Sequence, residues 1–262
     1  MTTVTPLRMY QVTSGVVAPV DGHQVDATNV STAIPYRVGD DVQPEVFTPL
    51  TVDSFSWSGS TWTVKHGDNI PPQNNDWSRS SVALGDQGSL RMRVAPDSEG
   101  SWKAAEIVKT ESVGYGTYSF TTTSSVIPTN INSVLGLFTY AVDSVNEGYE
   151  EIDIEYAQWG SPSYGPGSWS VHKPSPHYVQ SYNLTYTGPL VHTFLWEPNS
   201  IHWTITRQST GQILHENYFT GSLVPTYSAA LMRINFWLMN GEAPSGAEPF
   251  EVIFSSATWT AL

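Results

Sequence analysis

One short segment of the sequence has a two-residue period that fits a β-strand. It reads Glu-Glu-Ile-Asp-Ile-Glu and ends at residue 155. Successive side chains of a strand point to opposite faces, so Glu151, Asp153 and Glu155 share one face. Ile152 and Ile154 share the other face and are suited to a hydrophobic core. The segment therefore predicts a strand in a sheet that is covered on one side and carries three carboxylates on the other.

Three neighbouring carboxylates on one face repel one another, and this repulsion does not help the chain to fold. Two interpretations account for them. The first is an acidic strand edge that water solvates. The second is a retaining glycosidase, which needs one carboxylate as the nucleophile and one protonated carboxyl as the general acid, with pKa values that separate the two roles. The spacing alone does not choose between them, and the surrounding sequence favours the second.

The rest of the chain is typical of an all-β protein. Its 262 residues include 20 Gly and 18 Pro, and turn residues separate stretches rich in Thr, Val, Tyr, Trp and Ser. Apolar and polar residues alternate in segments such as Ser89–Val94, Tyr115–Thr121 and Ile201–Thr206, whereas no sustained helical period is present. No longer repeat is present either, which argues against a propeller or a solenoid. We predict one large β-sandwich with little helix, because sandwiches of this length are often single domains.

The charge balance narrows the choice of partner. The formal net charge is −13, with only 11 Lys and Arg residues. Nucleic acids, anionic membranes and acidic polysaccharides favour basic surfaces, so we expect none of them as a partner. Aromatic residues make up 12% of the chain, and those that are not core residues are suited to stack on sugar rings. We expect a neutral polysaccharide or oligosaccharide as the partner, bound by a monomer.

Several other functions lack their sequence signals. The chain has no Cys, and therefore no disulfide and no thiol chemistry. Its seven His are scattered, and no phosphate-binding loop or nucleophile-elbow Ser is present, so we expect no metal and no cofactor. No apolar run is long enough to span a membrane. The first residues lack the pattern of a signal peptide, and we expect a secreted or extracellular protein whose signal is absent from this sequence.

The first 48 residues differ from the rest of the chain. They are polar and rich in Val, Thr and Pro, and Pro44–Val46 with Pro49 marks a junction. A segment this short and polar cannot bury a core of its own without disulfides or a metal. We expect residues 1–48 to form an arm that packs on the sandwich, or else a linker, and residues 49–262 to form the main domain.

Short motifs around the acidic segment carry a family resemblance. The first are Ala105–Thr110, Gly114–Tyr118, Phe138–Tyr140 and Glu151–Glu155. The later ones are His192–Phe194, Trp196–Asn199, Ile201–Trp203, Asn235–Trp237 and Asn240–Gly241. Together they resemble glycoside hydrolase family 16, and within it the bacterial lichenases, which are β-1,3-1,4-glucanases. The resemblance covers about residues 52 to 260 and identifies residues 49–262 as a family 16-like catalytic domain.

The resemblance implies a concanavalin A-like β-jelly-roll sandwich whose concave sheet forms an open cleft for a polysaccharide. It assigns Glu151 to the nucleophile, Glu155 to the general acid and base, and Asp153 to a carboxylate that tunes both neighbours. The Cα atoms of Glu151 and Glu155 are about 13 Å apart on a flat strand, whereas retaining chemistry needs carboxyl groups about 5 to 5.5 Å apart. The two side chains can close that gap if they lean inward on a concave strand.

The resemblance also implies a set of residues that contact the sugar. They are Asn74, Glu106, Phe138, Tyr140, His172, Asn235 and Trp237. The three aromatic residues among them can instead be core residues. His172 follows the stretch Gly160–Ser168, which looks inserted, and an ordinary surface histidine is an equal alternative for it.

The sequence departs from the lichenases at several positions. Val108 replaces an Arg that binds substrate, and Tyr149 replaces a Trp that precedes the nucleophile. Ser255 stands where the family often has an Asp that helps to hold a structural calcium, so a calcium site is not expected here. The unbulged spacing of the acidic motif is shared with lichenases and xyloglucan-active enzymes, and by resemblance it favours a β-1,4 bond in a glucan backbone.

These features lead to one main hypothesis for the function and two alternatives. The main hypothesis is a retaining endo-acting glycoside hydrolase that cleaves a β-glucan by double displacement, with mixed-linkage β-1,3-1,4-glucan as the first candidate. The first alternative is a transglycosylase on the same scaffold, which passes the glycosyl group to a sugar instead of water. The second is a non-catalytic carbohydrate-binding lectin. The presence of all three carboxylates argues against the lectin.

Overall fold

The computed structural model of the protein describes residues 9–13, 16–20, 46–143, 148–173, 177–226, 229–244 and 249–262. By its internal contacts the chain divides into two units, Met1–Val46 and Phe47–Leu262. In the first unit, strand β1 (Met9–Thr13) pairs with β2 (Val16–Val20) as an antiparallel hairpin. Most of residues 1–48 lies outside the described residues, so the arm or linker expected there stays a prediction.

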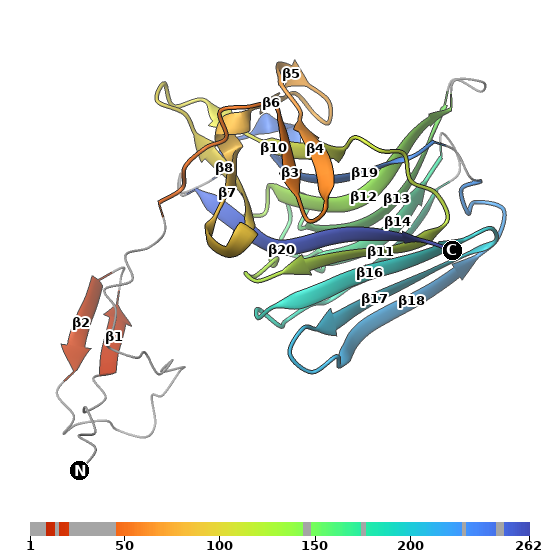
Figure 1. Cartoon of the computed structure of the whole chain (residues 1–262). Coiled ribbons are helices and arrows are strands. Elements are labelled where there is room, and N and C mark those ends of the chain that lie inside the picture. The colour runs from red at the N-terminus through yellow and green to blue at the C-terminus, as the bar shows by residue number, and fades with distance from the viewer. Residues whose placement is uncertain are drawn as a thin grey trace, which may run out of the picture. The chain divides into compact units, whose positions relative to one another are not determined.

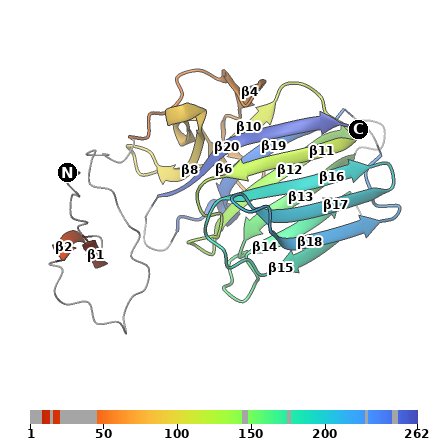
Figure 2. The ribbon, with the colours of Figure 1, turned by 60° about the horizontal axis from the view of Figure 1, so that its bottom comes forward.

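The second unit is built from two large antiparallel sheets (Figures 1 and 2). In the order of hydrogen-bonded neighbours, sheet I consists of β15 (Tyr178–Tyr182), β14 (Gly167–His172), β13 (Gly148–Ala157), β12 (Ser133–Asp143), β19 (Leu231–Leu238), β10 (Ala105–Lys109), β4 (Ser60–Val64) and β3 (Ser54–Trp57). Sheet II consists of β18 (Ile213–Thr220), β17 (Ser200–Arg207), β16 (Leu190–Glu197), β11 (Gly116–Thr122), β20 (Phe250–Ala261), β8 (Leu90–Pro96), β7 (Val82–Leu84) and, paired with β8, β9 (Trp102–Lys103). The predicted all-β sandwich is confirmed.

Few other elements accompany the two sheets in the described residues. A separate hairpin is formed by β5 (Gly67–Ile70) and β6 (Asn75–Trp77). The helices are short 3-10 turns: η1 (Arg79–Ser81), η2 (Asp86–Gly88) and η3 (Met239–Gly241). In this part of the chain, no helix has the length and apolar character needed to cross a membrane.

Alternating residues of the strands form the core between the two sheets. The side chains of β16 alternate between buried and half-buried along the whole strand. Sheet I contributes Ile152 and Ile154, and sheet II contributes Tyr118 and Phe194, whose rings stack at a centroid distance of 4.4 Å. Full burial of an apolar side chain such as Ile or Phe contributes about 1.5–3 kcal/mol. Because the two isoleucines lie in this core, the residues that alternate with them on β13 face away from sheet II.

The outer face of sheet I, which points away from sheet II, carries a second hydrophobic cluster. Its buried members are Trp77, Ala104, Val134, Ala157 and Trp237. Trp77 comes from the β5–β6 hairpin, so this hairpin packs on one end of the outer face. Asn75 fixes the hairpin there, because its amide donates a hydrogen bond of 2.8 Å to the carbonyl of Leu238 and accepts one of 3.0 Å from the Leu238 N–H.

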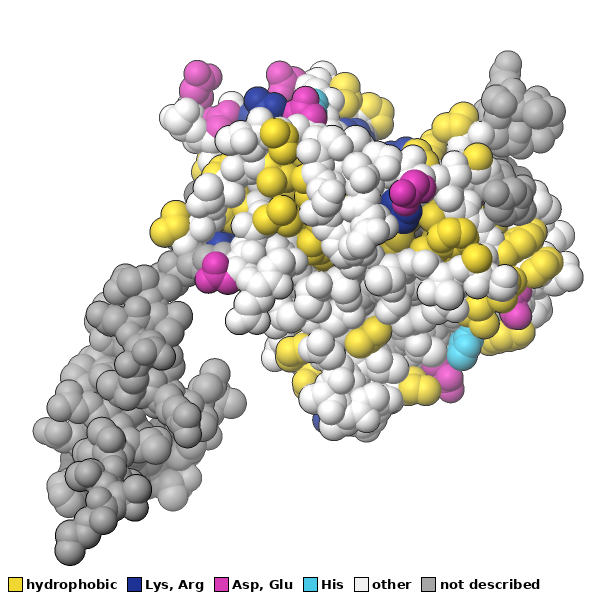
Figure 3. Space-filling model, viewed as in Figure 1, with side chains coloured by type: hydrophobic (Ala, Val, Ile, Leu, Met, Phe, Trp, Pro, Cys, Tyr) yellow, Lys and Arg dark blue, Asp and Glu magenta, His cyan; other side chains and the backbone are white. Residues whose placement is uncertain are grey.

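On the face of the molecule shown in Figure 3, charged side chains are sparse and uncharged groups predominate. In the whole chain, 24 acidic residues outnumber 11 Lys and Arg residues. Lys103 partly offsets this acidic excess, because its single ammonium group lies close to three carboxylates. Its Nζ lies 3.1 Å from Asp76 and 3.6 Å from both Asp68 and Asp97.

Candidate active site

The three predicted carboxylates lie on β13, an interior strand of sheet I that β12 and β14 flank. Glu151 and Glu155 are half-buried, and Asp153 is only 3% exposed. Ile152 and Ile154 are fully buried in the core on the opposite face. The strand therefore presents the carboxylate triplet, Glu151, Asp153 and Glu155, on the outer face of sheet I, as its two-residue period predicts.

Strand β14 supplies polar partners for Asp153. Ser170 is in register with Asp153, and its hydroxyl donates a hydrogen bond of 2.8 Å to Asp153 Oδ2. His172 is in register with Glu151, and its Nε2 lies 3.7 Å from the same Asp153 oxygen. The structure thus places His172 beside the carboxylate triplet. The sequence-based prediction omits Ser170, although its place two residues before His172 puts it on the same face.

Burial and mutual repulsion keep the carboxylate triplet protonated to higher pH than usual. Burial raises the pKa of Glu151 to about 7, although a hydrogen bond with Asp153 and the charge of Arg233 oppose the rise. Burial and the charge of Glu151 raise the pKa of Glu155 to about 8. Burial and both glutamates raise the pKa of Asp153 well above its ordinary value. The hydrogen bond from Asp153 and the charge of Arg233 favour loss of the proton from Glu151, and the two protonation steps belong to the coupled pair.

An ion cluster of Glu106, Lys65 and Arg233 lies on the same outer face. Glu106 on β10 is 2% exposed, and its two carboxylate oxygens contact Lys65 Nζ at 3.0 Å and Arg233 Nη1 at 2.8 Å. The prediction that Glu106 contacts sugar remains untested, but both of its oxygens already bind protein cations. The sequence-based prediction omits Arg233. Its position could have indicated it, because it lies two residues before Asn235 on the same strand and therefore on the same face.

The predicted aromatic residues also lie on the outer face, but they differ in exposure. Phe138 and Tyr140 on β12 are in register with two of the carboxylates. Phe138 and Trp237 are each 5% exposed, whereas Tyr140 is half-buried. Trp237 packs edge-on against Trp159 at a centroid distance of 6.2 Å. Tyr140 is therefore the most accessible of the three to a ligand.

Asn235 approaches the triplet because its neighbour on β12 is a glycine. Gly136 is in register with Glu155 on one side and with Asn235 on the other. A Cβ at Gly136 would lie 2.5 Å from Asn235 Oδ1, so the amide occupies the space that a larger residue would need. Asn235 is 7% exposed, and its Oδ1 has no hydrogen-bond partner among the described residues. This oxygen is buried against Gly136 and has no exposed surface, so Asn235 does not present it to a ligand in this arrangement.

Asn74 lies in the exposed turn between β5 and β6. The backbone oxygen of Asn74 is so close to Gly241 that a Cβ there would lie only 2.7 Å from it. The side chain of Gln73 accepts a hydrogen bond of 2.8 Å from the Asn240 N–H. The turn therefore packs on η3 at the end of β19, and Asn74 belongs to the hairpin at that end of the outer face.

The described residues offer no cluster of metal ligands. Ser255, at the place of the family's calcium ligand, is exposed on β20 of sheet II. Its hydroxyl lacks the charge that makes a carboxylate a good calcium ligand. In the part of the chain that the structure describes, no group of three or more His, Cys, Asp or Glu residues is placed to hold a metal ion.

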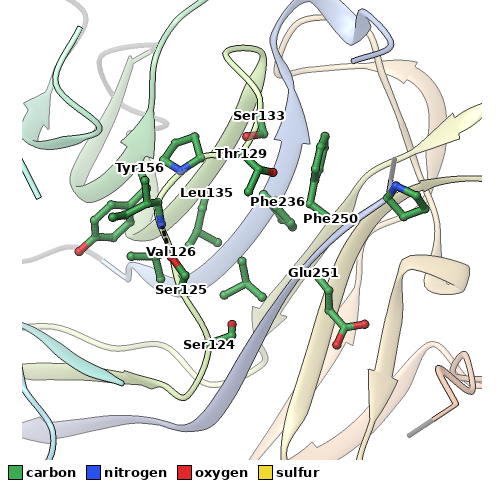
Figure 4. A pocket seen from close by; sticks show the side chains of 14 residues that line it. Ser124, Ser125, Val126, Thr129, Ser133, Leu135, Tyr156, Phe236, Phe250 and Glu251 are labelled. Atoms are coloured by element: carbon green, nitrogen blue, oxygen red, sulfur yellow. Dashed lines mark hydrogen bonds between the residues drawn. The ribbon is translucent and has the colours of Figure 1, made fainter. Parts of the chain in front are cut away.

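A cavity of about 370 Å³ lies behind the outer face and is distinct from the carboxylate triplet (Figure 4). Leu135 and Tyr156 line it from sheet I, and Phe250 and Glu251 line it from sheet II. Tyr156 directly follows Glu155 on β13, so its side chain points to the inner face while that of Glu155 points outward. The cavity is therefore part of the space between the sheets.

Comparison with known proteins gives matches to solved structures. No family model and no curated protein matches the sequence. The structure resembles the β-glucanase of Bacillus licheniformis, with 20% identity, a TM-score of 0.63, and coverage of 81% of this chain and 100% of that one. It resembles a family 16 endo-glucanase from Bacteroides ovatus in complex with G4G3G-2F-DNP, with 12% identity, a TM-score of 0.57 and coverage of 76% and 94%. It also resembles an immunostimulatory antigen and pseudo β-1,3-glucanase of Mycobacterium tuberculosis, with 16% identity, a TM-score of 0.55 and coverage of 74% and 88%.

At these identities the matches show a shared fold, and they confirm the predicted β-jelly-roll sandwich. The same fold occurs in glucanases and in a pseudo-glucanase. Fold alone therefore does not assign a reaction to this chain. That assignment depends on the side chains that the outer face of sheet I brings together.

Proposed function

We propose that the protein is a retaining endo-acting glycoside hydrolase that cleaves a β-glucan by double displacement. The main support is the carboxylate triplet on one face of β13, where burial raises the pKa of both Glu151 and Glu155. While this coupled pair holds one proton, one group is a carboxylate and the other is a carboxylic acid. A retaining glycosidase needs this combination in its resting state.

In the first step, a carboxylate oxygen of Glu151 forms a bond to the anomeric carbon of the sugar. The bond from that carbon to the glycosidic oxygen breaks, and Glu155 donates its proton to the departing oxygen. The raised pKa of Asp153 favours its protonated form, which can donate a hydrogen bond to Glu151. Ser170 in turn holds Asp153 in place through its 2.8 Å hydrogen bond.

In the second step, Glu155 acts as the base. Its carboxylate takes a proton from a water molecule, whose oxygen bonds to the anomeric carbon and displaces Glu151. Two successive inversions leave the anomeric configuration retained. In a transglycosylase a sugar hydroxyl takes the place of this water, and the same residues serve both reactions.

The surroundings of the carboxylate triplet support a neutral glucan, with mixed-linkage β-1,3-1,4-glucan as the first candidate. Tyr140 is a partly accessible ring on the same face. The net charge of −13 disfavours an anionic glycan. A fold neighbour, the Bacteroides ovatus endo-glucanase, was solved in complex with G4G3G-2F-DNP.

The proposal is tested with soluble mixed-linkage glucan, xyloglucan, laminarin and agarose. We expect new reducing ends from mixed-linkage glucan with the wild type and none above background with Glu151→Gln, which keeps the shape of the side chain. Proton NMR should then show the β-anomer as the first product. An α-anomer formed first would contradict retention, and equal rates for wild type and variant would contradict the site.

A non-catalytic carbohydrate-binding protein is the second candidate, because a pseudo-glucanase has the same fold. Isothermal titration with glucan oligosaccharides separates the two functions. Binding without any product, with equal affinity for the wild type and Glu151→Gln, would favour the binding protein. Longer oligosaccharides in the presence of acceptors would favour the transglycosylase.

A further inference from the structure

We infer that Arg233 is a positioning residue whose charge keeps Glu151 ionised while Glu155 still carries its proton. Glu106 holds Arg233 in place for this role. The inference rests on the proposed function in one respect, because it takes Glu151 as the nucleophile. The expected effect of Arg233 on the ionisation of Glu151 does not depend on a substrate, so it can be measured without one.

The strand register places Arg233 on the face that carries the carboxylate triplet. On β19 it is paired with Phe138 on one side and with Val108 on the other. It alternates with Ile234, which is fully buried in the core, so its side chain projects to the outer face. With 23% of its side chain exposed, Arg233 is partly shielded from water, which strengthens the action of its charge on nearby groups.

Two contacts fix the guanidinium group. Arg233 Nη1 lies 2.8 Å from Glu106 Oε1, and Glu106 is 2% exposed. The central guanidinium carbon lies 5.1 Å from the ring centroid of Tyr140, which is in register with Glu151. The cation is thus held between a buried carboxylate and the residue beside the proposed nucleophile. A long side chain that is held in this way acts from a constant position.

The ion cluster carries an excess of positive charge. Glu106 is shared between Arg233 and Lys65, whose Nζ lies 3.0 Å from its other oxygen. Two cations and one carboxylate leave a formal charge of +1 on the outer face, in a chain whose net charge is −13. Of the two cations, Arg233 is the one whose charge lowers the pKa of Glu151.

Charged and titratable groups face Glu151 from its own strand and from four others. They are Asp153 and Glu155 on β13, Tyr140 on β12, His172 on β14, Arg233 on β19 and Glu106 on β10. Arg233 lowers the pKa of Glu151, and Glu106 raises it. Burial lowers the pKa of His172, so this ring is neutral at neutral pH. Of these groups, Arg233 is therefore the one that supplies a positive charge.

The experiment measures the titration of Glu151 directly. Carbon-13 NMR follows the side-chain carboxyl carbons of glutamate, and the Glu151 signal is assigned by its loss in Glu151→Gln. We expect Arg233→Gln to raise the pKa of Glu151 by about one unit, because it removes a nearby positive charge. The acidic limb of kcat/KM should move to higher pH by the same amount, so that activity well below the limb falls about tenfold. Arg233→Lys keeps the charge and should restore most of the wild-type titration.

Two further variants separate the charge effect from a loss of packing. Lys65→Gln removes a partner of the same Glu106 carboxylate, but Lys65 is not among the charges that shift Glu151, so the Glu151 titration should stay in place. Glu106→Gln removes a negative charge and should move the Glu151 pKa downward, opposite to Arg233→Gln. If Arg233→Gln does not fold, Arg233→Met, which removes the charge and keeps the length of the side chain, carries the test.

An unchanged Glu151 titration in both Arg233→Gln and Glu106→Gln would overturn the inference. So would a loss of activity in Arg233→Gln that is equal at every pH, with the NMR titration in its wild-type place. Opposite NMR shifts in a protein that cleaves none of the glycans would uphold the role of Arg233 and contradict the proposed function instead.

Discussion

Glu151 and Glu155 have identical side chains, and their surroundings decide which of them ionises first. Both are half-buried, and burial is the largest cause of the raised pKa in each. Glu151 also receives a hydrogen bond from Asp153 and the charge of Arg233, which favour its carboxylate form. Glu155 faces the charge of Glu151, which disfavours its own ionisation. The proposed retaining mechanism needs an asymmetry of this kind.

At the residue scale we expect a bell-shaped dependence of kcat/KM on pH. Activity should rise as Glu151 loses its proton near pH 7 and fall as Glu155 loses its proton near pH 8, because the nucleophile must be charged and the acid must be neutral. The apparent pKa values of the two limbs are properties of the coupled pair and not of either glutamate alone. Initial rates on a soluble glucan across this range test the expectation. Maximal activity under strongly acidic conditions, where both groups are protonated, would contradict it.

Chemical rescue should distinguish the two glutamates. Glu151→Ala removes the nucleophile and leaves space for a small anion, so azide should restore turnover and give a glycosyl azide of inverted configuration. Glu155→Ala keeps the nucleophile, so a substrate with a good leaving group should still glycosylate the enzyme, and azide should then give the retained product. NMR of the glycosyl azides is the measurement. The same anomer from both variants would contradict the assignment.

At the scale of elements, the β5–β6 hairpin shapes one end of the outer face of sheet I. Trp77 from this hairpin and Trp237 from β19 belong to one hydrophobic cluster. Asn75 joins the hairpin to Leu238 through two hydrogen bonds and is buried. Its neighbour Asn74 is exposed. The position of Asn74, which is predicted to contact sugar, therefore depends on the buried amide of Asn75.

We expect Asn75→Ala to lower the free energy of unfolding by about 1–3 kcal/mol, because it leaves the buried N–H and C=O of Leu238 without their partner. Asn74→Ala is the matched control and should leave stability within about 0.5 kcal/mol of the wild type. Denaturant unfolding measures both. If Asn74 contacts the sugar as predicted, Asn74→Ala should raise KM without a loss of stability. Equal destabilisation by the two variants would contradict the role of Asn75.

At the scale of the whole molecule, the chain divides into the units Met1–Val46 and Phe47–Leu262. The second unit contains both large sheets, the core between them and all three residues of the carboxylate triplet. It therefore has the core that a domain needs to fold without the first unit.

We expect the fragment of residues 47–262 to fold with an unchanged β-sheet spectrum and to keep the activity of the whole chain. If residues 1–48 form an arm on the sandwich, the fragment should have a lower Tm, by about 2–4 °C for each 1 kcal/mol of lost contact. Differential scanning calorimetry of both proteins is the measurement. An equal Tm would contradict the arm and favour the linker.

Local periodicity explains what could be predicted from the sequence. The alternation around Ile152 and Ile154 is a property of consecutive residues, so the β13 strand and its two faces follow from it without any knowledge of partners. Repeated alternation and dense turn residues likewise lead to an all-β sandwich, and the motifs outside β13 lead to the jelly roll. Whether the predicted sugar-contacting residues do contact sugar stays a prediction.

The partners of the carboxylate triplet were decided by the tertiary structure. Ser170 and Arg233 come from β14 and β19, and their distance from Asp153 and Glu151 depends on how the strands of sheet I are ordered and registered. A shift of one residue in the register of β19 would turn Arg233 into the core and Ile234 to the outer face. The register is set by the packing of many side chains between the sheets, which no short segment encodes. The sequence by itself determined that this chain carries three carboxylates on one face of a strand, and the fold decided which charges surround them.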